Sequence, residues 1–268
     1  MKPEKIRELL TLNGKVALVT DSGSLASIDV APLLADAGAQ MVIADKDPAA
    51  TENLADQINA SGGKAIAIPT DVESEPSVLA LFKRVRETIG RLDILANCAG
   101  VNSNQPFIEA TLAQFDDSTS VNLRSTFMLM REGVKLMLEG GVGGRIVNIT
   151  TMGSLHPVMN GNEIYSATRS GVTMLTRSVA MDYAKDHILA NCVLPGAVMG
   201  KTRFHQSTLD AVKAGRILSG PAVDPERRLP LGYLNARDIA MAVLLLAGPS
   251  GGYITGQSIV LDGGFLSS

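Results

Sequence analysis

Short apolar runs alternate with longer amphipathic stretches along the chain. The apolar runs predict strands at residues 15–20, 40–45, 64–69, 92–97, 144–150, 188–194 and 257–264. The stretches between them carry apolar residues at helical spacing, and they predict helices at residues 33–38, 54–58, 78–89, 121–138, 165–185 and 238–248. Strands that alternate with helices in this way are typical of βαβ units.

The predicted strands are apolar at successive positions rather than at alternate positions. Strands of this kind are buried on both faces, as in a parallel sheet that helices cover on each side. Gly38 and the pair Gly62 and Gly63 follow two of the predicted helices, where a left-handed residue often ends a helix. The pattern therefore predicts an α/β fold with a doubly wound, mostly parallel sheet.

The alternation breaks down at residues 197–232, a polar segment that we expect to be irregular because it contains Pro221, Pro225 and Pro230. Segments of this length are usually functional, so we expect a lid over a substrate site. Its apolar residues are Phe204, Leu209, Val212, Ile217 and Leu218. The helix and strand after it close the chain without a linker, which favours a single domain over residues 1–268.

Composition and charge narrow the classes of function. The chain has 268 residues, of which 46% are hydrophobic, and a formal net charge of −3. It has no basic excess to neutralise phosphates, so we expect no nucleic-acid partner. The longest apolar run, residues 239–247, is about half as long as a membrane span, and the first residues lack the apolar stretch of a signal peptide. We therefore expect a soluble protein that does not contact a membrane.

Cysteine and histidine are scarce. Cys98 and Cys192 lie in apolar stretches at strand ends and are too few for a disulfide framework, so we expect a reducing, cytoplasmic compartment. His156, His187 and His205 do not pair with one another, or with a cysteine, at the spacings that bind zinc or iron. We expect no protein-bound metal.

The chain carries, in order, the segments LNGKVALVT, MVIADKD, TDV, LDILANCAG, SVNLRSTF, GRIVNITT, YSATR, VLPGAV, RLPLGYLNARDIA and YITGQSIVLDGG. Together these segments resemble the short-chain dehydrogenase/reductase family over nearly the full length. The resemblance implies a three-layer Rossmann fold with a seven-stranded sheet, usually in a dimer or tetramer. It also implies that a nicotinamide cofactor exchanges hydride with an alcohol or carbonyl compound.

The first βα turn departs from the family pattern. In the family this turn carries a Thr-Gly motif and two further glycines, because the backbone must approach the cofactor pyrophosphate closely. Here the turn begins Thr20, Asp21 and Ser22, and the motif glycines fall on Asp21, Leu25 and Ser27. A carboxylate beside an anionic ligand costs on the order of 1 kcal/mol. We expect dinucleotide binding to be weak or lost; the alternative is a rebuilt turn that binds the cofactor by a shifted route.

Other positions at which the family contacts its cofactor are present. Asp45 ends the second predicted strand, where a carboxylate binds the adenosine ribose hydroxyls and favours NAD over NADP. The remaining positions are Asp71, Val72, Asn97, Ala99, Gly100 and Pro195. Asp45 and these positions have an alternative role as strand-end or turn residues. The cofactor expected by ancestry is thus NAD, bound weakly or no longer bound.

The family's chemistry needs an ionisable phenol, a hydroxyl that polarises the carbonyl, a cation that lowers the phenol pKa and a route for protons. The resemblance assigns the phenol to Tyr165. It places Arg169, four residues on and on the same helical face, where the family has lysine, and this exchange is not conservative. It assigns the asparagine that holds a relay water to Asn122, whose alternative role is to satisfy buried backbone groups.

The hydroxyl position falls on Thr151, one residue farther from Tyr165 than is usual in the family. Thr150 and Ser154 are the other candidates. Met152 has the usual spacing but carries no hydroxyl. The motif glycines, the lysine and the serine have therefore all changed in one chain.

These joint changes favour a non-catalytic subunit, a pseudoenzyme. Such a subunit would assemble with an active homologue of the same family in an NAD-dependent alcohol or hydroxyacyl-CoA dehydrogenase complex. One alternative is a divergent but active NAD-dependent alcohol dehydrogenase or ketoreductase. The other is a small-molecule-binding or regulatory module that binds no nucleotide. The expected partner is a homologous subunit or, as a homodimer or homotetramer, a second copy of this chain.

Overall fold

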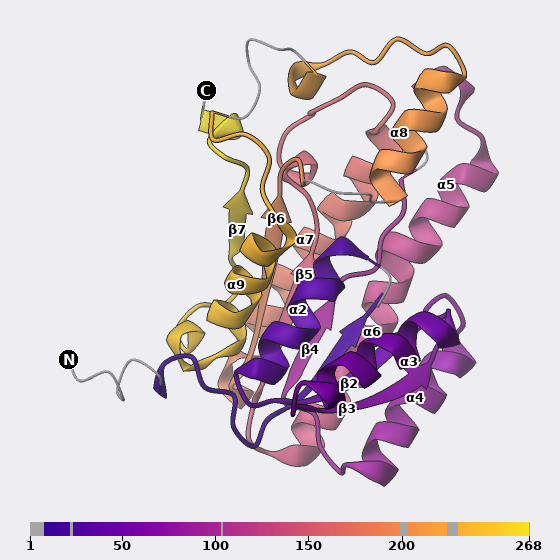
Figure 1. Ribbon diagram of the computed structural model, residues 1–268. Helices are drawn as coiled ribbons and strands as arrows, with labels where there is room; N and C mark the ends of the chain where they lie inside the picture. The colour runs from indigo at the N-terminus through magenta and orange to yellow at the C-terminus, as the bar shows by residue number, and fades with distance from the viewer. Residues whose placement is uncertain (1–7, 22–23, 103, 199–202, 224–229, 268) are drawn as a thin grey trace.

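The computed structural model describes residues 8–21, 24–102, 104–198, 203–223 and 230–267, without the side chains of residues 25–27, 203–207 and 223. At its centre seven strands form one parallel sheet in the order β3-β2-β1-β4-β5-β6-β7 (Figure 1). The strands are β1 (Val16–Thr20), β2 (Gln40–Asp45), β3 (Lys64–Pro69), β4 (Ile94–Asn97), β5 (Gly144–Ile149), β6 (Ile188–Pro195) and β7 (Ser258–Leu261). The predicted doubly wound α/β fold is confirmed.

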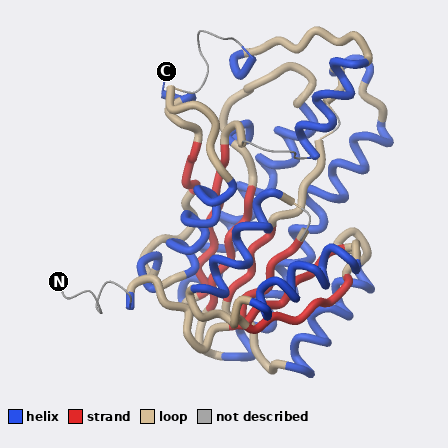
Figure 2. The backbone as a smooth tube through the Cα atoms, viewed as in Figure 1, coloured by secondary structure: helices blue, strands red, loops and turns tan. Residues whose placement is uncertain are grey.

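Helices cover both faces of this sheet, so the strands form the middle of three layers (Figure 2). One face packs against α2 (Leu25–Asp36), α3 (Pro48–Ala60) and α9 (Ala236–Ala247). The other packs against α4 (Glu75–Thr88), α6 (Ser125–Gly140) and α7 (Glu163–Tyr183). Each face thus has its own hydrophobic core.

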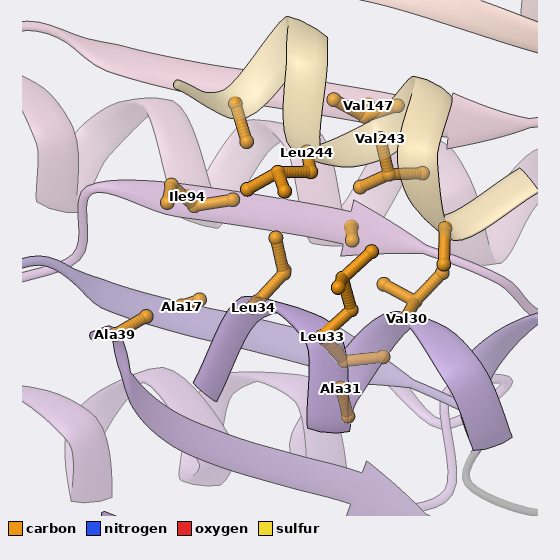
Figure 3. Packing of buried hydrophobic residues seen from close by; sticks show 14 of the residues in the cluster. Ala17, Val30, Ala31, Leu33, Leu34, Ala39, Ile94, Val147, Val243 and Leu244 are labelled. Carbon is orange, nitrogen blue, oxygen red and sulfur yellow. The ribbon is translucent and has the colours of Figure 1, made fainter. Parts of the chain in front are cut away.

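Strand β1 shows why the predicted strands are apolar at every position. Ala17 and Val19 belong to the core beneath α2 and α9, whereas Val16 and Leu18 belong to the core beneath α4 and α6. Successive side chains of a strand point to opposite faces, and both faces are covered here. Figure 3 shows the first core, in which residues of α2 and α9 meet those of the strands.

The strand order reverses between β1 and β4. The chain runs outward from β1 to β3 and then returns to add β4 on the other side of β1. In open α/β sheets, ligands bind in the crevice beyond the carboxyl ends of the strands at such a switch point. This position contains the predicted first turn, after β1, and the predicted motif that follows β4.

The predicted helix at residues 121–138 is wrong in its extent. The structure has α5 (Leu112–Thr119), a π-helical turn η2 (Ser120–Arg124) and then α6. A capping box between Thr111 and Gln114 starts this helical run well before the apolar stripe begins. Hydrophobic periodicity missed α5, because only one of its side chains is buried.

The segment at residues 197–232 is not irregular throughout, contrary to the prediction. Its described residues form α8 (Arg203–Lys213) and a 3₁₀ turn η5 (Pro221–Val223). The three prolines lie after α8, so they do not interrupt it. In Figure 1, α8 lies at the end of the molecule toward which the strand arrows point, near α5.

Cys98 and Cys192 are both buried and form no disulfide. Within the described part of the chain, no histidine, cysteine and carboxylate side chains gather in a group that suits a metal ion. None of the described helices combines the length and apolar character needed to cross a bilayer.

Candidate active site

The first βα turn holds a carboxylate in a conformation that suits glycine. Asp21 has a φ of +61°, and its backbone N–H donates to Ala44 O at 3.0 Å. A left-handed conformation costs a residue with a Cβ roughly 1 kcal/mol, although aspartate adopts it more readily than most residues. The carboxylate is buried, at 6% exposure for the residue. Asp21 therefore keeps the backbone shape of the motif glycine and adds a charge at the same point.

The other motif positions of this turn are only partly described. Thr20 is fully buried, and its Oγ1 accepts the backbone N–H of Cys98 at 3.1 Å. Leu25 is the first residue of α2, but its side chain and that of Ser27 lie outside the described residues, as does the whole of Ser22. Thr20 thus ties the end of β1 to the segment after β4 and does not face outward.

Arg169, on α7, lies across the segment that follows β4. Its Nη2 donates to Ala99 O at 2.8 Å, and the residue is only 4% exposed. A Cβ placed on Gly100 would collide with that same Nη2, so the guanidinium occupies the space that this glycine leaves open. Arg169 Nε has no hydrogen-bond partner among the described residues, although it is buried. The guanidinium is thus packed against the backbone at the predicted cofactor position.

The predicted phenol and cation do meet. Arg169 Cζ lies 5.4 Å from the centroid of the Tyr165 ring, a distance at which a cation and an aromatic ring attract each other. Their spacing along α7 brings both side chains to one face of the helix. Tyr165 is half-buried, whereas Arg169 is enclosed.

Opposite charges act on the thiol at the start of this segment. Burial raises the pKa of the Cys98 thiol well above its usual range, the charge of Asp21 raises that pKa further, and the charge of Arg169 lowers it. A carboxylate and a guanidinium that both affect one buried thiol belong to a single electrostatic environment, where effective dielectric constants are low. The two residues that replace the family's glycine and lysine therefore act on the same buried thiol with opposite signs.

Hydroxyl groups near Tyr165 have mostly structural partners. Thr151 begins the 3₁₀ turn η3 (Met152–Ser154), and its Oγ1 accepts the N–H of Gly153 at 3.1 Å. Ser154 Oγ donates to Thr151 O at 2.6 Å. Thr150 Oγ1 is buried and has no hydrogen-bond partner in the described part of the chain. Met152 is buried and packs in a small apolar cluster with Val158 and Phe265.

Asn122 sits in the π-helical turn and is fully buried. Its Oδ1 accepts the N–H of Val101 at 2.9 Å, and its Nδ2 donates to Val101 O at 3.0 Å. Nδ2 also lies 3.0 Å from the hydroxyls of Ser118 and Thr168. The side chain therefore joins the segment after β4 to α5 and α7, which is the structural alternative for this residue.

The predicted adenosine positions lie at strand ends and have local partners. Asp45 Oδ1 accepts the N–H of Asp47 at 2.9 Å, and Asp45 is buried. Asp71 pairs with Lys46 at 3.1 Å, and this hydrogen bond is the main reason that the pKa of Lys46 is raised. Val72, next in the chain, is partly buried against the core beneath α4.

The remaining predicted positions are also engaged within the protein. Asn97 Nδ2 donates to Asn148 Oδ1 at 2.7 Å, which links β4 to β5. Pro195 is the buried last residue of β6. Sequence reasoning missed one cation near the lid: Arg216 donates to Asn104 O and to Gln105 Oε1. No motif marked it, because it belongs to none of the segments that carry the family resemblance.

Comparison with known proteins identifies the family. A profile of the family described as enoyl-(acyl carrier protein) reductase matches residues 23–266. A short-chain dehydrogenase/reductase of Pestalotiopsis microspora is 31% identical over 260 residues, which cover 94% of this chain and 96% of that protein. This chain belongs to the short-chain dehydrogenase/reductase family.

Other family members similar to this chain have named activities. The 7alpha-hydroxysteroid dehydrogenase of Escherichia coli K12 is 30% identical over 258 residues, covering 95% of each chain. The crystal structure of a gluconate 5-dehydrogenase from Burkholderia cenocepacia J2315, in complex with NADP and tartrate, has 27% identity and a TM-score of 0.87. That alignment covers 98% of this chain and 99% of the other. The chain thus has the fold of oxidoreductases, and these relatives are named as dehydrogenases.

Proposed function

We propose that this chain is a non-catalytic subunit of short-chain dehydrogenase/reductase fold. It would assemble with an active homologue in an NAD-dependent alcohol or hydroxyacyl-CoA dehydrogenase complex. The observation that carries the proposal is the position of Arg169, whose Nη2 fills the space over Gly100 and binds Ala99 O at 2.8 Å. The resemblance places the nicotinamide ribose beside the family's lysine, and the guanidinium that replaces it is bulkier than an ammonium and already bound to Ala99 O, so we infer that it disfavours a dinucleotide bound in the family's manner.

The first turn supports the same proposal from the other end of the cofactor site. A helix N-terminus with close backbone N–H groups attracts a pyrophosphate, and a buried carboxylate at that turn opposes it. Asp21 places such a carboxylate there, at 6% exposure. A bound pyrophosphate would meet a like charge in a poorly hydrated site, which costs on the order of 1 kcal/mol or more.

The exposed surface of α5, α6 and α7 supports assembly with another subunit. Large apolar side chains on these helices are exposed to solvent, at fractions from 43% to 81%. They are Leu112, Phe115, Phe127, Leu138, Met174 and Met181. Large apolar patches on a protein surface are typical of protein interfaces.

An active NAD(P)-dependent dehydrogenase is the second candidate, and two observations favour it. The relatives named above are dehydrogenases or reductases, which supports activity more directly than inactivity. Tyr165 is retained, with a guanidinium 5.4 Å from its ring. In that case Tyr165 would exchange the substrate proton, Arg169 would place a positive charge beside its ring, and the Thr151 hydroxyl would polarise the carbonyl. A third possibility, a binding module under the lid, shares the loss of nucleotide binding with the first.

Titration of the purified chain with NADH and NADPH separates these candidates. We expect neither thermal stabilisation nor saturable fluorescence at millimolar cofactor. Saturable binding with a Kd below about 100 μM, near −5.5 kcal/mol, would refute the proposal and support the dehydrogenase. A variant that combines Asp21→Gly, Leu25→Gly, Ser27→Gly and Arg169→Lys should gain binding. The matched control carries the same three glycine substitutions together with Arg169→Gln, which removes the cation. This control should gain less cofactor binding.

Native mass spectrometry of the complex isolated from its own cells tests the partnership. A hetero-oligomer with a homologous subunit is the expected result. Detection of homo-oligomers alone would contradict the assembly proposed here, while the cofactor titration would still report on catalysis.

A further inference from the structure

Arg216 links the lid to the segment that follows β4. It comes after α8 and Gly215, and it donates from Nη1 to Asn104 O and from Nη2 to Gln105 Oε1. Both acceptors are neutral, and Arg216 makes no ion pair with a described residue. The side chain is half-buried. Its positive charge therefore has no counter-charge in the described part of the protein.

The groups around Arg216 are mainly uncharged amides and hydroxyls. Asn104 Nδ2 lies 3.5 Å from Thr208 Oγ1, and Asn102 Nδ2 donates to Asn162 Oδ1 at 2.9 Å. Asn160 donates from its backbone and its side chain to Ser219, at 2.9 Å and 2.6 Å. These bonds join three segments at the carboxyl edge of the sheet: the segment after β4, the segment before α7 and the lid.

Two carboxylates on the segments that this network joins have other partners. Glu163 Oε1 accepts the N–H of Gly161 at 3.3 Å and is exposed. Asp210, on α8, lies 3.9 Å from Lys213. Neither carboxylate neutralises Arg216.

The backbone that Arg216 binds is held in an unusual conformation. Asn104 is 3% exposed and has a φ of +33°, in the left-handed region. Gly161 makes room for it, since a Cβ there would lie 2.5 Å from Asn104 Oδ1. Residues in such conformations persist where surrounding contacts over-determine them, and they cluster at ligand sites. The guanidinium of Arg216 is therefore bound to a backbone segment that other contacts also hold.

We infer that Arg216 recognises the carboxylate of a small acidic ligand bound beneath the lid. Two of its five N–H groups bind Asn104 and Gln105, which leaves three for a ligand. A planar guanidinium matches a carboxylate with two parallel hydrogen bonds, and one charge balances one charge. A phosphate dianion would leave a net negative charge among neutral amides. The ligand class is thus a carboxylic acid rather than a phosphate ester.

The inference depends on the proposed function in one respect, namely that the lid still covers a ligand site. Asn162, which binds Asn102 in this network, precedes Tyr165 by three residues. The hydrogen bonds of Arg216, Asn104 and Asn102 thus reach the residue that precedes the helix of Tyr165. In a non-catalytic subunit Arg216 selects the ligand; in a dehydrogenase Arg216 would select the substrate.

Binding of butyrate, a monocarboxylate, to the intact chain tests the inference, with butyramide as the uncharged probe of similar shape. Calorimetry or NMR titration should show that Arg216→Gln weakens butyrate binding by about tenfold or more, as expected for a lost charge-assisted pair. Arg216→Lys should retain part of the affinity, because it keeps the charge without the fork. Butyramide should bind weakly, and equally, to the native chain and to Arg216→Gln.

A control separates ligand recognition from anchoring of the lid. Gln105→Ala removes one acceptor of Arg216 and keeps the charge, so butyrate should bind as well as to the native chain. The inference is overturned if Gln105→Ala weakens binding as much as Arg216→Gln, or if Arg216→Gln leaves it unchanged. Tighter binding of inorganic phosphate than of butyrate would also overturn it. Where Arg216→Gln unfolds, equal butyrate affinity in Arg216→Lys and in the native chain overturns the inference. NADH binding would refute the proposed function alone.

Discussion

The thiol of Cys98 is the most strongly perturbed acid near the candidate site. Burial is the main cause of its raised pKa, and Asp21 and Arg169 act on it with opposite signs. A thiol whose pKa is higher in the folded state holds its proton longer there than in the unfolded chain. Its contribution to stability is complete below the unfolded pKa, near 8.5, and is lost as the pH rises above that value.

We therefore predict that the free energy of unfolding falls more steeply with pH in the native chain than in Cys98→Ala. Between pH 8 and pH 10 the thiol should account for about 2 kcal/mol of the loss, since each pH unit above the unfolded pKa costs about 1.4 kcal/mol. Urea unfolding at a series of pH values measures the difference. Cys192, whose pKa is also raised by burial, stays in both proteins and cancels. Parallel curves for the two proteins would contradict this prediction.

The sequence predicted which residues occupy the motif positions but not which contacts their side chains make. The replacement of glycine by Asp21 and of lysine by Arg169 follows from the order of the motifs. That Arg169 turns onto Ala99 and Gly100 does not, because residues about 70 positions apart meet only through the packing of α7 against the sheet. The role of Met152 in an apolar cluster with Phe265 depends on tertiary contact in the same way.

Among the secondary-structure elements, β1 and β4 are joined at their starts by one buried carboxylate. Asp93, just before β4, accepts the N–H of Val16 at 2.9 Å. It also pairs with Lys15 at 3.2 Å and with Arg91, while its own side chain is 4% exposed. Two central strands thus depend on a carboxylate that is fully hydrogen-bonded.

We predict that Asp93→Ala lowers the free energy of unfolding by roughly 3 kcal/mol, because it leaves a buried N–H and two cations without their acceptor. The matched control is Glu139→Ala, which breaks an exposed pair with Arg86 at 2.8 Å. That change should cost less than about 1 kcal/mol. Urea is the denaturant of choice, since guanidinium chloride screens ion pairs. Equal losses in the two variants would contradict the prediction.

The elements also show where periodicity succeeds and fails. It located every strand, because strands buried on both faces are continuous apolar runs. It missed α5, which has only one buried side chain, and α8, whose apolar residues lie in a segment predicted to be irregular from its polar residues and prolines. The Thr111 and Gln114 capping box was a usable signal for α5.

If the molecule assembles as proposed, we expect the outer surfaces of α6 and α7 to form the interface with the second subunit. Phe127 and Met174 are 45% and 59% exposed on these two neighbouring helices. A second subunit that covers them would remove apolar area from water, at about 25 cal/mol for each Å². A glutamate introduced on each helix should prevent the second subunit from binding, because burying a carboxylate without a partner costs free energy.

We predict that the pair of changes Phe127→Glu and Met174→Glu abolishes assembly in native mass spectrometry and leaves the circular dichroism spectrum unchanged. Leu79→Glu is the control: Leu79 lies on α4, outside these two helices, and its exposure of 44% matches that of Phe127. It adds one negative charge on a helix other than α6 and α7, so it should assemble as the native chain does. If both variants assemble normally, the partner binds elsewhere and the exposed apolar side chains of α9 become the next surface to change. If both fail, the net charge of the chain and not this surface controls assembly, since added negative charge weakens association at any site.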